Sequence, residues 1–403
     1  MRVPQFLATN APWLAAGGLL TLLSSFGQTF FISIFAAEIQ GTFSLSHGEW
    51  GGIYAIGTTA SAAVMVWAGG LTDVFRVRNI GSIILALLGL SCLFMATNPF
   101  VWALPIVIFC LRLTGQGMTS HIAVVAMARW FVAARGKALS IATLGFSVGE
   151  AVLPIVFVTL LTMMDWRWLW VVAACISFAG IPILIALLKR ERTPQSMAQE
   201  NASLGMNKHH WGRMEALRHP LFWFMVPAIL GPSAFNTAFF FHQVYFAELK
   251  GWDHLTLVSM FPIYTTVSIA AMIASGWALD KVGTPRLIPF FQLPMVAAFL
   301  CFAFSQSIAL TVIGFVMLGL TAGANSTLPA AFWAEFYGTR YIGSIKALAA
   351  AFMVLGSAIG PGLTGLLIDQ GVGLESQFIG IAAFFILTSV LIWIGVRKYA
   401  DKL

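Results

Sequence analysis

Charged residues are scarce in this sequence. Only 9% of its 403 residues are Asp, Glu, Lys or Arg, and 59% are hydrophobic, whereas a soluble domain carries roughly 25% charged residues. A water-soluble fold of this length has too little interior to hide so much apolar surface. The scarcity of charge therefore excludes an ordinary soluble protein.

Cysteine is also rare, and the motifs of enzyme chemistry are missing. The four cysteines lie inside apolar stretches, at Cys92, Cys110, Cys175 and Cys301. Their spacing fits neither a metal site nor a disulfide framework. The sequence has no nucleotide-binding glycine loop with its lysine, and no nucleophile with an evident base partner. We therefore expect no enzyme activity, no metal, no cofactor and no use of ATP, which leaves an ion or proton gradient as the energy source.

Long apolar runs make up most of the chain. Many reach the roughly 20 residues that a helix needs to cross a bilayer. Twelve such segments cover approximately residues 11–37, 51–71, 80–96, 101–128, 138–163, 168–188, 220–246, 255–279, 287–304, 308–332, 345–368 and 378–396. The pattern predicts an all-α polytopic membrane protein with twelve transmembrane helices. We expect the first span to be retained, because no clear small-residue cleavage site follows it.

The distribution of basic residues indicates the topology. The net charge is +7. Apart from Arg112, which lies inside a span, only Arg167 and Lys250 fall on the opposite side of the membrane from the other Lys and Arg residues in this alternation of spans. By the positive-inside rule, both termini and the loop from Lys189 to His219 are cytoplasmic. The basic excess is thus a topology signal, and no nucleic-acid partner is expected. We expect a multi-pass protein of a bacterial inner membrane that works as a monomer in the lipid bilayer.

The longest polar segment divides the spans six and six. It predicts an N-terminal six-helix bundle over residues 1–188, a cytoplasmic loop over 189–219 and a C-terminal bundle over 220–403. Four pairs of segments correspond in order at a nearly constant offset: Ala37–Gly41 with Ala247–Gly251, Gly69–Asp73 with Gly276–Asp280, Ala128–Phe131 with Ala334–Tyr337, and Gly145-x-x-x-Gly149 with Gly356-x-x-x-Gly360. Such repeats predict two pseudo-symmetric bundles with a solute site near mid-membrane. The two glycine pairs also predict close helix packing.

The loop segments Gly69-x-Leu71-x-Asp73, with Arg78, and Gly276-x-x-x-Asp280-Lys281-x-Gly283-x-x-Arg286 resemble the loop motif of the major facilitator superfamily. The resemblance covers essentially the whole chain and implies a secondary transporter that works by alternating access. It also implies a cytoplasmic gate, to which we assign Asp73, Arg78, Asp280, Lys281, Arg286 and Arg129. The first motif departs from the family pattern, since Arg76 stands where a glycine is usual and Val74 where a basic residue is usual.

Two charged residues lie deep inside the predicted spans. Arg112 and Glu150 are each about 17 Å of helical rise from the nearest span end. Because an ionisable group at this depth costs roughly 2.5–3.5 kcal/mol on insertion scales, each one favours a functional role. The two spans are antiparallel neighbours, so we expect a direct or water-bridged pair. The C-terminal half has Gly319 and Pro361 at the equivalent positions, which indicates that the fold does not require this pair.

Arg112-x-x-Gly115-x-Gly117 resembles the fourth-span motif of the superfamily, whose arginine is linked to proton coupling or anion binding. We predict that Glu150 accepts and releases a coupling proton, and that Arg112 becomes free to hold a solute anion when Glu150 is protonated. The alternative is a fixed ion pair that only locks the N-terminal half.

Further polar candidates for the solute or coupling site are His242, Gln28, Asn236 and Asn325. His242 lies near the outer end of the seventh span, where it would act as a gate or proton site or simply reach the headgroups. For each of the other three, a hydrogen bond to a neighbouring helix is the alternative role.

The solute class depends on a local resemblance. Arg129-Trp130-Phe131, followed by Arg135-Gly136-Lys137-Ala138-Leu139, looks most like the monocarboxylate and oxalate–formate porter branch. This resemblance implies proton-coupled symport of a small organic anion. One alternative is a proton-coupled exporter of amphipathic drugs or metabolites, whose pocket the many Phe and Met side chains would line. Another is a membrane sensor that does not transport, although no added signalling domain is evident.

Overall fold

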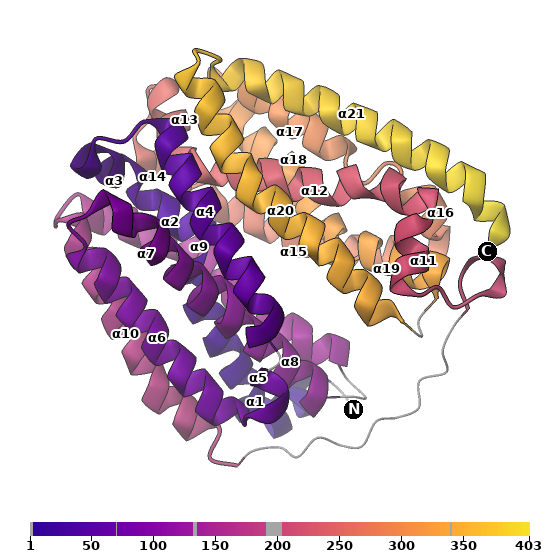
Figure 1. Ribbon diagram of the computed structural model, residues 1–403, viewed down its shortest axis with the longest axis horizontal. Coiled ribbons are helices and arrows are strands. Elements are labelled where there is room, and N and C mark those ends of the chain that lie inside the picture. Colours follow the sequence, from indigo (N-terminus) through magenta and orange to yellow (C-terminus); the bar gives the residue numbers. More distant parts are fainter. Residues whose placement is uncertain (1–2, 70, 132–134, 191–203, 339–340) are drawn as a thin grey trace. The chain divides into compact units, whose positions relative to one another are not determined.

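The computed structural model describes residues 3–69, 71–131, 135–190, 204–338 and 341–403, and every regular element in these ranges is a helix (Figure 1). The chain divides into two compact units. The first contains the chain up to residue 199 together with Phe240–Tyr245, and the second contains the rest. The bounds 1–188, 189–219 and 220–403 stay a prediction.

The first unit contains the helices of the N-terminal half. In chain order they are α1 (Val3–Leu23), η1 (Ser24–Gly27), α2 (Thr29–Ile32), η2 (Ser33–Phe35), α3 (Ala36–Phe43), α4 (His47–Ala68), α5 (Leu71–Val74), α6 (Val77–Thr97), η3 (Val101–Ala103), α7 (Leu104–Leu111), η4 (Arg112–Thr119), α8 (Ser120–Trp130), α9 (Arg135–Leu161) and α10 (Trp166–Leu187).

The second unit contains the helices of the C-terminal half. They are η6 (Met206–Lys208), α11 (Arg213–Arg218), α12 (Pro220–Phe241), α13 (Gln243–Leu249), α14 (His254–Val258), α15 (Phe261–Val282), α16 (Thr284–Leu287), α17 (Leu293–Phe304), α18 (Ile308–Asn325), α19 (Leu328–Tyr337), α20 (Ile342–Asp369), α21 (Leu374–Tyr399) and η7 (Ala400–Lys402). The last residues of α12 and the first of α13 are those that belong to the first unit.

The helices have the length and composition of membrane spans. Ten helices in the described residues are long and apolar enough to cross a bilayer, and two shorter apolar ones cover Thr29–Phe43 and Leu293–Phe304. α4 adds a helix of 22 residues, which is about 33 Å long at the usual rise. The prediction of an all-α polytopic membrane protein is confirmed. Thr29–Phe43 continues the first predicted span after Phe6–Gly27, so these helices are consistent with a count of twelve.

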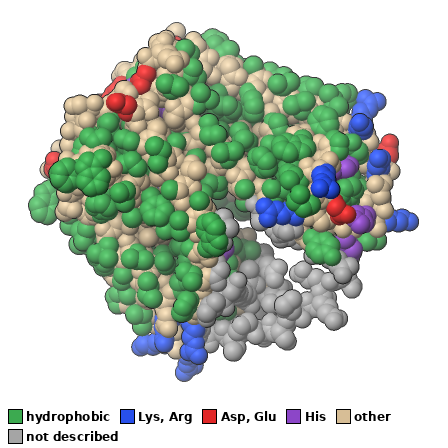
Figure 2. Space-filling model, in the orientation of Figure 1, with side chains coloured by type: hydrophobic (Ala, Val, Ile, Leu, Met, Phe, Trp, Pro, Cys, Tyr) green, Lys and Arg blue, Asp and Glu red, His purple; other side chains and the backbone are tan. Residues whose placement is uncertain are grey.

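Apolar side chains cover the outside of the helices as well as the inside. On α6, Leu85 and Leu88 are fully buried, whereas Ile83 and Leu90 are 60% and 54% exposed. Figure 2 shows hydrophobic side chains over much of the visible surface, with Lys and Arg gathered in a few groups. A helix that is hydrophobic all round is stable when one face packs on protein and the other contacts lipid.

Short polar residues define where several helices begin. At α4 the Ser46 side chain accepts a hydrogen bond from the Glu49 N–H, and the Glu49 carboxylate accepts one from the Ser46 N–H. The Asp165 side chain caps α10 in a similar way, and Ser307 caps α18. These bonds satisfy N–H groups that have no partner within the helix.

One glycine pair in each unit brings two helices close together, as the sequence predicted. A side chain on Gly145 or Gly149 of α9 would collide with Thr21 or Ser25 of the first span. In the second unit, a Cβ on Gly356 of α20 would lie 2.6 Å from the Leu230 carbonyl oxygen of α12. The prediction of close packing at these glycines is therefore confirmed.

The second half of the central loop is folded, which the sequence analysis did not predict. Met206 is fully buried, the Trp211 N–H donates to the Tyr337 carbonyl, and a Cβ on Gly205 would lie 2.5 Å from the Tyr337 carbonyl carbon. The segment Leu204–His219 thus packs onto the end of α19. Within it, the Gly212 N–H and His209 lower the pKa of the Glu215 carboxyl below its usual range.

Candidate functional site

The first span is broken in its middle. α1 ends at Leu23, a 3-10 turn covers Ser24–Gly27, and Gln28 is extended with φ −87° and ψ 154°. The N–H groups of Phe31 and Ile32 both donate to the Gln28 carbonyl. In a continuous α-helix the Phe31 N–H would donate to the Gly27 carbonyl instead. The break therefore releases the Gly27 carbonyl from the backbone ladder.

Arg112 takes up the released carbonyl. Its Nη1 donates to the Gly27 oxygen at 3.2 Å and to the Thr29 Oγ1 at 3.3 Å. The guanidinium also lies 5.3 Å from the centre of the Tyr54 ring, and the Tyr54 hydroxyl is 2.5 Å from Thr29 Oγ1. Arg112 is only 2% exposed, so its charge is held inside the first unit by neutral groups and an aromatic ring.

Arg112 begins a π-helix of eight residues, η4. The Thr119 hydroxyl donates to the Thr114 carbonyl five residues earlier, at 2.6 Å. A Cβ on Gly115 would lie 2.6 Å from the Gly27 Cα, so the first and fourth spans touch through their backbones. π-helical segments are rare and frequent at functional sites. The sequence analysis missed this one, although Thr-Gly-x-Gly inside an apolar span is a weak signal for it.

Glu150 follows Gly149 on α9, and α9 contacts the same break in the first span. Both α9 and η4 pack against η1, and Gly149 faces Ser25 of that turn. The structure thus brings the helices of Arg112 and Glu150 to one place, with the Glu150 side chain partly buried. The contacts of Arg112 described above are with the first span and α4, and the pairing with Glu150 stays a prediction.

Gln28 and His242 are also found in the first unit, and both are buried, at 9% and 4% exposed. Gln28 occupies the break itself. The His242 ring lies 6.0 Å from the His47 ring at the start of α4. The positions of Gln28 and His242 are compatible both with a role in the solute or coupling site and with a purely structural role. Their function stays a prediction.

Gln243, next to His242, is a polar contact that the sequence analysis missed. Its side-chain amide donates to the Phe30 carbonyl at 3.1 Å and to the Ser33 hydroxyl at 2.7 Å. The neighbouring Phe241 stacks on Trp50 with ring centres 5.5 Å apart. The sequence signal that could have indicated this contact is a glutamine next to a histidine at the end of a phenylalanine-rich run. These contacts hold the segment Phe240–Tyr245 against the first span and α4.

Asn236 and Asn325 lie in the second unit, on α12 and at the end of α18. In the described ranges, the side-chain oxygen of each is buried and has no hydrogen-bond partner. The same holds for the hydroxyl of Thr321, one turn before Asn325. Buried polar atoms without a partner are few in native proteins. These three atoms are therefore available to accept hydrogen bonds from a solute or from water.

The structure describes four of the six side chains assigned to the cytoplasmic gate. Asp280 is exposed at the end of α15, and the Lys281 ammonium lies 4.2 Å from the centre of the Trp277 ring. Arg78 is partly buried on α6 and Arg286 is exposed on α16. The side chains of Asp73 and Arg129 lie outside the described residues. The gate stays a prediction.

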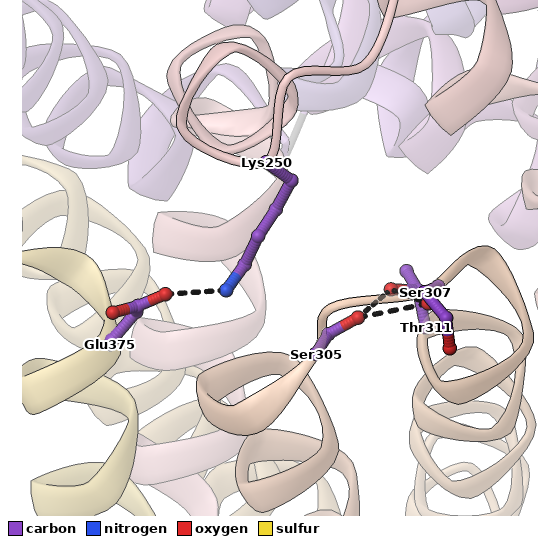
Figure 3. A network of polar contacts seen from close by, with 5 residues as sticks. All are labelled: Lys250, Ser305, Ser307, Thr311 and Glu375. Carbon is purple, nitrogen blue, oxygen red and sulfur yellow. Dashed lines mark hydrogen bonds and ion pairs between the residues drawn. The ribbon is translucent and has the colours of Figure 1, made fainter.

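The two basic residues predicted to face away from the cytoplasm have structural partners. Arg167 donates to the carbonyls of Ala96 and Asn98 at the end of α6, at 2.9 and 2.8 Å. Lys250 pairs with Glu375 at 2.5 Å, and its side chain is only 6% exposed (Figure 3). Both residues therefore stabilise helix ends.

A hydroxyl network also holds the turn between α17 and α18. Ser305 Oγ donates to the Ser307 carbonyl at 3.0 Å and is 2.6 Å from Thr311 Oγ1 (Figure 3). These bonds satisfy polar groups where the chain reverses between two apolar helices.

Apolar spans, a broken first helix and a buried arginine define a helical membrane transporter. The family profile of the Major Facilitator Superfamily matches residues 17–345 and 260–402. The chain therefore belongs to the Major Facilitator Superfamily. It is a multi-pass membrane transporter of a small solute and not an enzyme, as predicted from the sequence.

Known proteins resemble the chain over most of its length. Rat Monocarboxylate transporter 13 is 25% identical over 313 residues, which are 76% of this chain and 70% of the rat protein. The crystal structure of a bacterial homologue of the human lysosomal transporter Spinster, inward-facing and unoccupied, has a TM-score of 0.70 at 16% identity, with 98% of each chain covered. That of the nucleoside transporter NupG has a TM-score of 0.74 at 12% identity, with 96% of this chain and 99% of NupG covered. The two crystal structures are evidence for the fold alone.

Proposed function

We propose that this transporter is a proton-coupled symporter of small organic anions such as monocarboxylates, with Arg112 binding the carboxylate. The burial of Arg112 carries the proposal. Arg112 is 2% exposed, and within the described part of the chain its Nη1 donates to a carbonyl and a hydroxyl. Neither acceptor carries a charge that neutralises it. A buried cation is costly unless an anion compensates it. An anionic solute supplies that charge and forms charge-assisted hydrogen bonds.

One relative found by sequence similarity supports the solute class. The rat protein is named a monocarboxylate transporter and matches 76% of this chain. The local likeness of Arg129–Leu139 to the monocarboxylate and oxalate–formate branch points to the same solute class. A carboxylate with a small apolar part fits a buried arginine that lies beside the Tyr54 ring.

Glu150 is the proposed carrier of the coupling proton. It stands on α9, which packs against the same break as η4. When Glu150 is ionised it competes with the solute for Arg112, and when it is protonated Arg112 is free to bind the solute anion. Proton and anion therefore enter the site together, which is symport.

The remaining assignments complete the proposal. Gln28, His242, Asn236 and Asn325 line the solute pathway, and the loop residues Asp73, Arg78, Arg129, Asp280, Lys281 and Arg286 form the cytoplasmic gate. Both termini face the cytoplasm of a bacterial cell, and a monomer is the working unit.

Uptake by proteoliposomes tests this function. A panel of labelled small carboxylates is supplied with and without an inward proton gradient to wild type, Glu150→Gln and Arg112→Ala. We expect gradient-driven accumulation in wild type, exchange without accumulation in Glu150→Gln, and a loss of at least tenfold in Arg112→Ala. Glu248→Gln, which changes an exposed carboxylate on α13, is the matched control and keeps wild-type uptake.

Two results would contradict the proposal. Wild type that takes up no carboxylate under any gradient excludes the solute class. Glu150→Gln that still accumulates solute against its gradient excludes Glu150 as the proton carrier, whatever the solute.

A further inference from the structure

Tyr54 makes two contacts through its ring and one through its hydroxyl. The residue is fully buried on α4. One contact is with the Arg112 guanidinium, 5.3 Å from the ring centre, and another is with the Phe241 ring, 4.7 Å away centre to centre. The hydroxyl is 2.5 Å from Thr29 Oγ1. Tyr54 therefore touches both the arginine and the threonine that binds it.

Thr29 connects Tyr54 to Arg112 because its single oxygen serves both. Oγ1 accepts from Arg112 Nη1 and shares a hydrogen bond with the Tyr54 hydroxyl. A hydroxyl has one proton and two lone pairs, so both bonds can be made together. If Thr29 donates to Tyr54, its oxygen also becomes a better acceptor for the guanidinium, because hydrogen bonds in a chain polarise one another.

Without the Tyr54 hydroxyl, the Thr29 hydroxyl can form a different hydrogen bond. A threonine near a helix start readily turns its hydroxyl to a backbone carbonyl. That rotation would remove one of the two acceptors of Arg112 Nη1 and leave only the Gly27 carbonyl. The side chain of Arg112 would then be free to adopt other rotamers.

We propose that Tyr54 is a positioning residue for Arg112, which it holds through Thr29 so that one edge of the guanidinium stays directed to the solute anion. This proposal rests on the anion-binding role of Arg112. The two N–H bonds of Nη1 are used by Gly27 and Thr29, and Nε has no hydrogen-bond partner among the residues that the structure describes. The Nε–Nη2 edge matches the two oxygens of a carboxylate.

Transport kinetics with labelled lactate as the probe test the proposal first. Tyr54→Phe keeps the ring on Arg112 and Phe241 and removes only the hydroxyl. We expect KM to rise about fivefold, as for the loss of one net hydrogen bond, with kcat close to wild type. Thr29→Val should raise KM by a similar factor. The double variant should raise KM no more than either single change, because the two residues act as one unit. Tyr399→Phe, a buried tyrosine of the second unit, is the matched control.

A second measurement does not depend on the solute. Phenylglyoxal reacts with accessible arginine, and mass spectrometry of the peptide that contains Arg112 gives its labelling rate in purified protein. We expect labelling of Arg112 to be severalfold faster in Tyr54→Phe and in Thr29→Val than in wild type or Tyr399→Phe. A merely structural role of the Tyr54 hydroxyl would instead alter folding yield or kcat.

The outcomes separate this proposal from the proposed function. If wild type does not transport lactate but Arg112 labels faster in Tyr54→Phe, the positioning role holds and the solute class is wrong. If labelling of Arg112 is unchanged in Tyr54→Phe, or if the effects of Tyr54→Phe and Thr29→Val add fully, the positioning role is overturned.

Discussion

Gly27 is the residue on which the geometry of the arginine site depends most directly. It ends the 3-10 turn, supplies the carbonyl that Arg112 binds, and touches the fourth span through its backbone. A Cβ on Gly27 would lie 2.7 Å from the Gly115 Cα. Because the obstructing atoms are backbone, no side-chain rotation relieves the collision. Steric exclusion by the fourth span therefore explains why this position needs a glycine.

Replacing Gly27 by alanine tests this reason. We expect Gly27→Ala to push η4 away from the first span, to destabilise the protein by about 1–3 kcal/mol through overpacking, and to abolish most uptake. Melting temperature in detergent and uptake in proteoliposomes measure the two effects. Gly18→Ala is the control on the same span, because a Cβ there meets nothing within 4 Å. Wild-type melting and uptake in Gly27→Ala would show that the two spans do not need to touch.

Interrupted helices are the feature that stands out at the scale of elements. The break in the first span and the π-helix in the fourth lie against each other. An interrupted helix leaves backbone carbonyls without their usual partners, and inside a membrane no water replaces them. Arg112 satisfies one such carbonyl. Breaks of this kind are tolerated only where another part of the protein completes the hydrogen bonds.

The pair of Lys250 and Glu375 ties the end of α13 to the start of α21. Lys250 also lies 5.8 Å from the centre of the Phe246 ring. The pair is asymmetric, since the Lys250 side chain is 6% exposed and that of Glu375 is 53% exposed. Solvent at Glu375 weakens the attraction, while removal of the carboxylate leaves a buried ammonium without its partner.

Glu375→Gln should therefore lower the free energy of unfolding by about 1–2 kcal/mol. The double variant Glu375→Gln with Lys250→Met should recover part of the loss, because no buried charge is then left alone. Chemical denaturation in detergent measures both. Glu248→Gln serves as the control for an exposed carboxylate. Equal stability of Glu375→Gln and wild type would mean that the pair is only a surface contact.

For the molecule as a whole, the charge pattern predicts how the chain is oriented in the membrane. The segment Leu204–His219 carries lysine and arginine and belongs to the face predicted to be cytoplasmic. Met163, in the turn between α9 and α10, belongs to the opposite face and is 75% exposed. Asn207 in the loop segment is exposed as well.

Labelling with a membrane-impermeant maleimide tests the orientation. In intact bacterial cells we expect Met163→Cys to react and Asn207→Cys to react only after permeabilisation. The wild-type chain, whose four cysteines all lie in its helices, is the control for background labelling. Reaction of Asn207→Cys in intact cells would place the loop outside and invert the proposed topology.

The transporter fold was predictable because its signals are local to each segment. Twenty apolar residues need lipid wherever they occur, and glycines spaced four apart on one helix allow close packing whatever the partner. The same reasoning singled out Arg112 and Glu150, because a charge in an apolar run is visible without knowledge of any contact. Gln28 was likewise picked out as a polar residue in a span.

Sequence alone is enough to predict a helical membrane transporter of the Major Facilitator Superfamily, and it also predicts a solute site with an arginine deep in the fourth span. The tertiary structure was needed to show that Arg112 binds the Gly27 carbonyl and Thr29, that the Tyr54 ring lies near both Arg112 and Phe241, and that Gln243 binds the first span. These contacts join segments far apart in the chain. They follow from how backbones cross and where a helix breaks, which no local pattern of hydrophobicity or charge encodes.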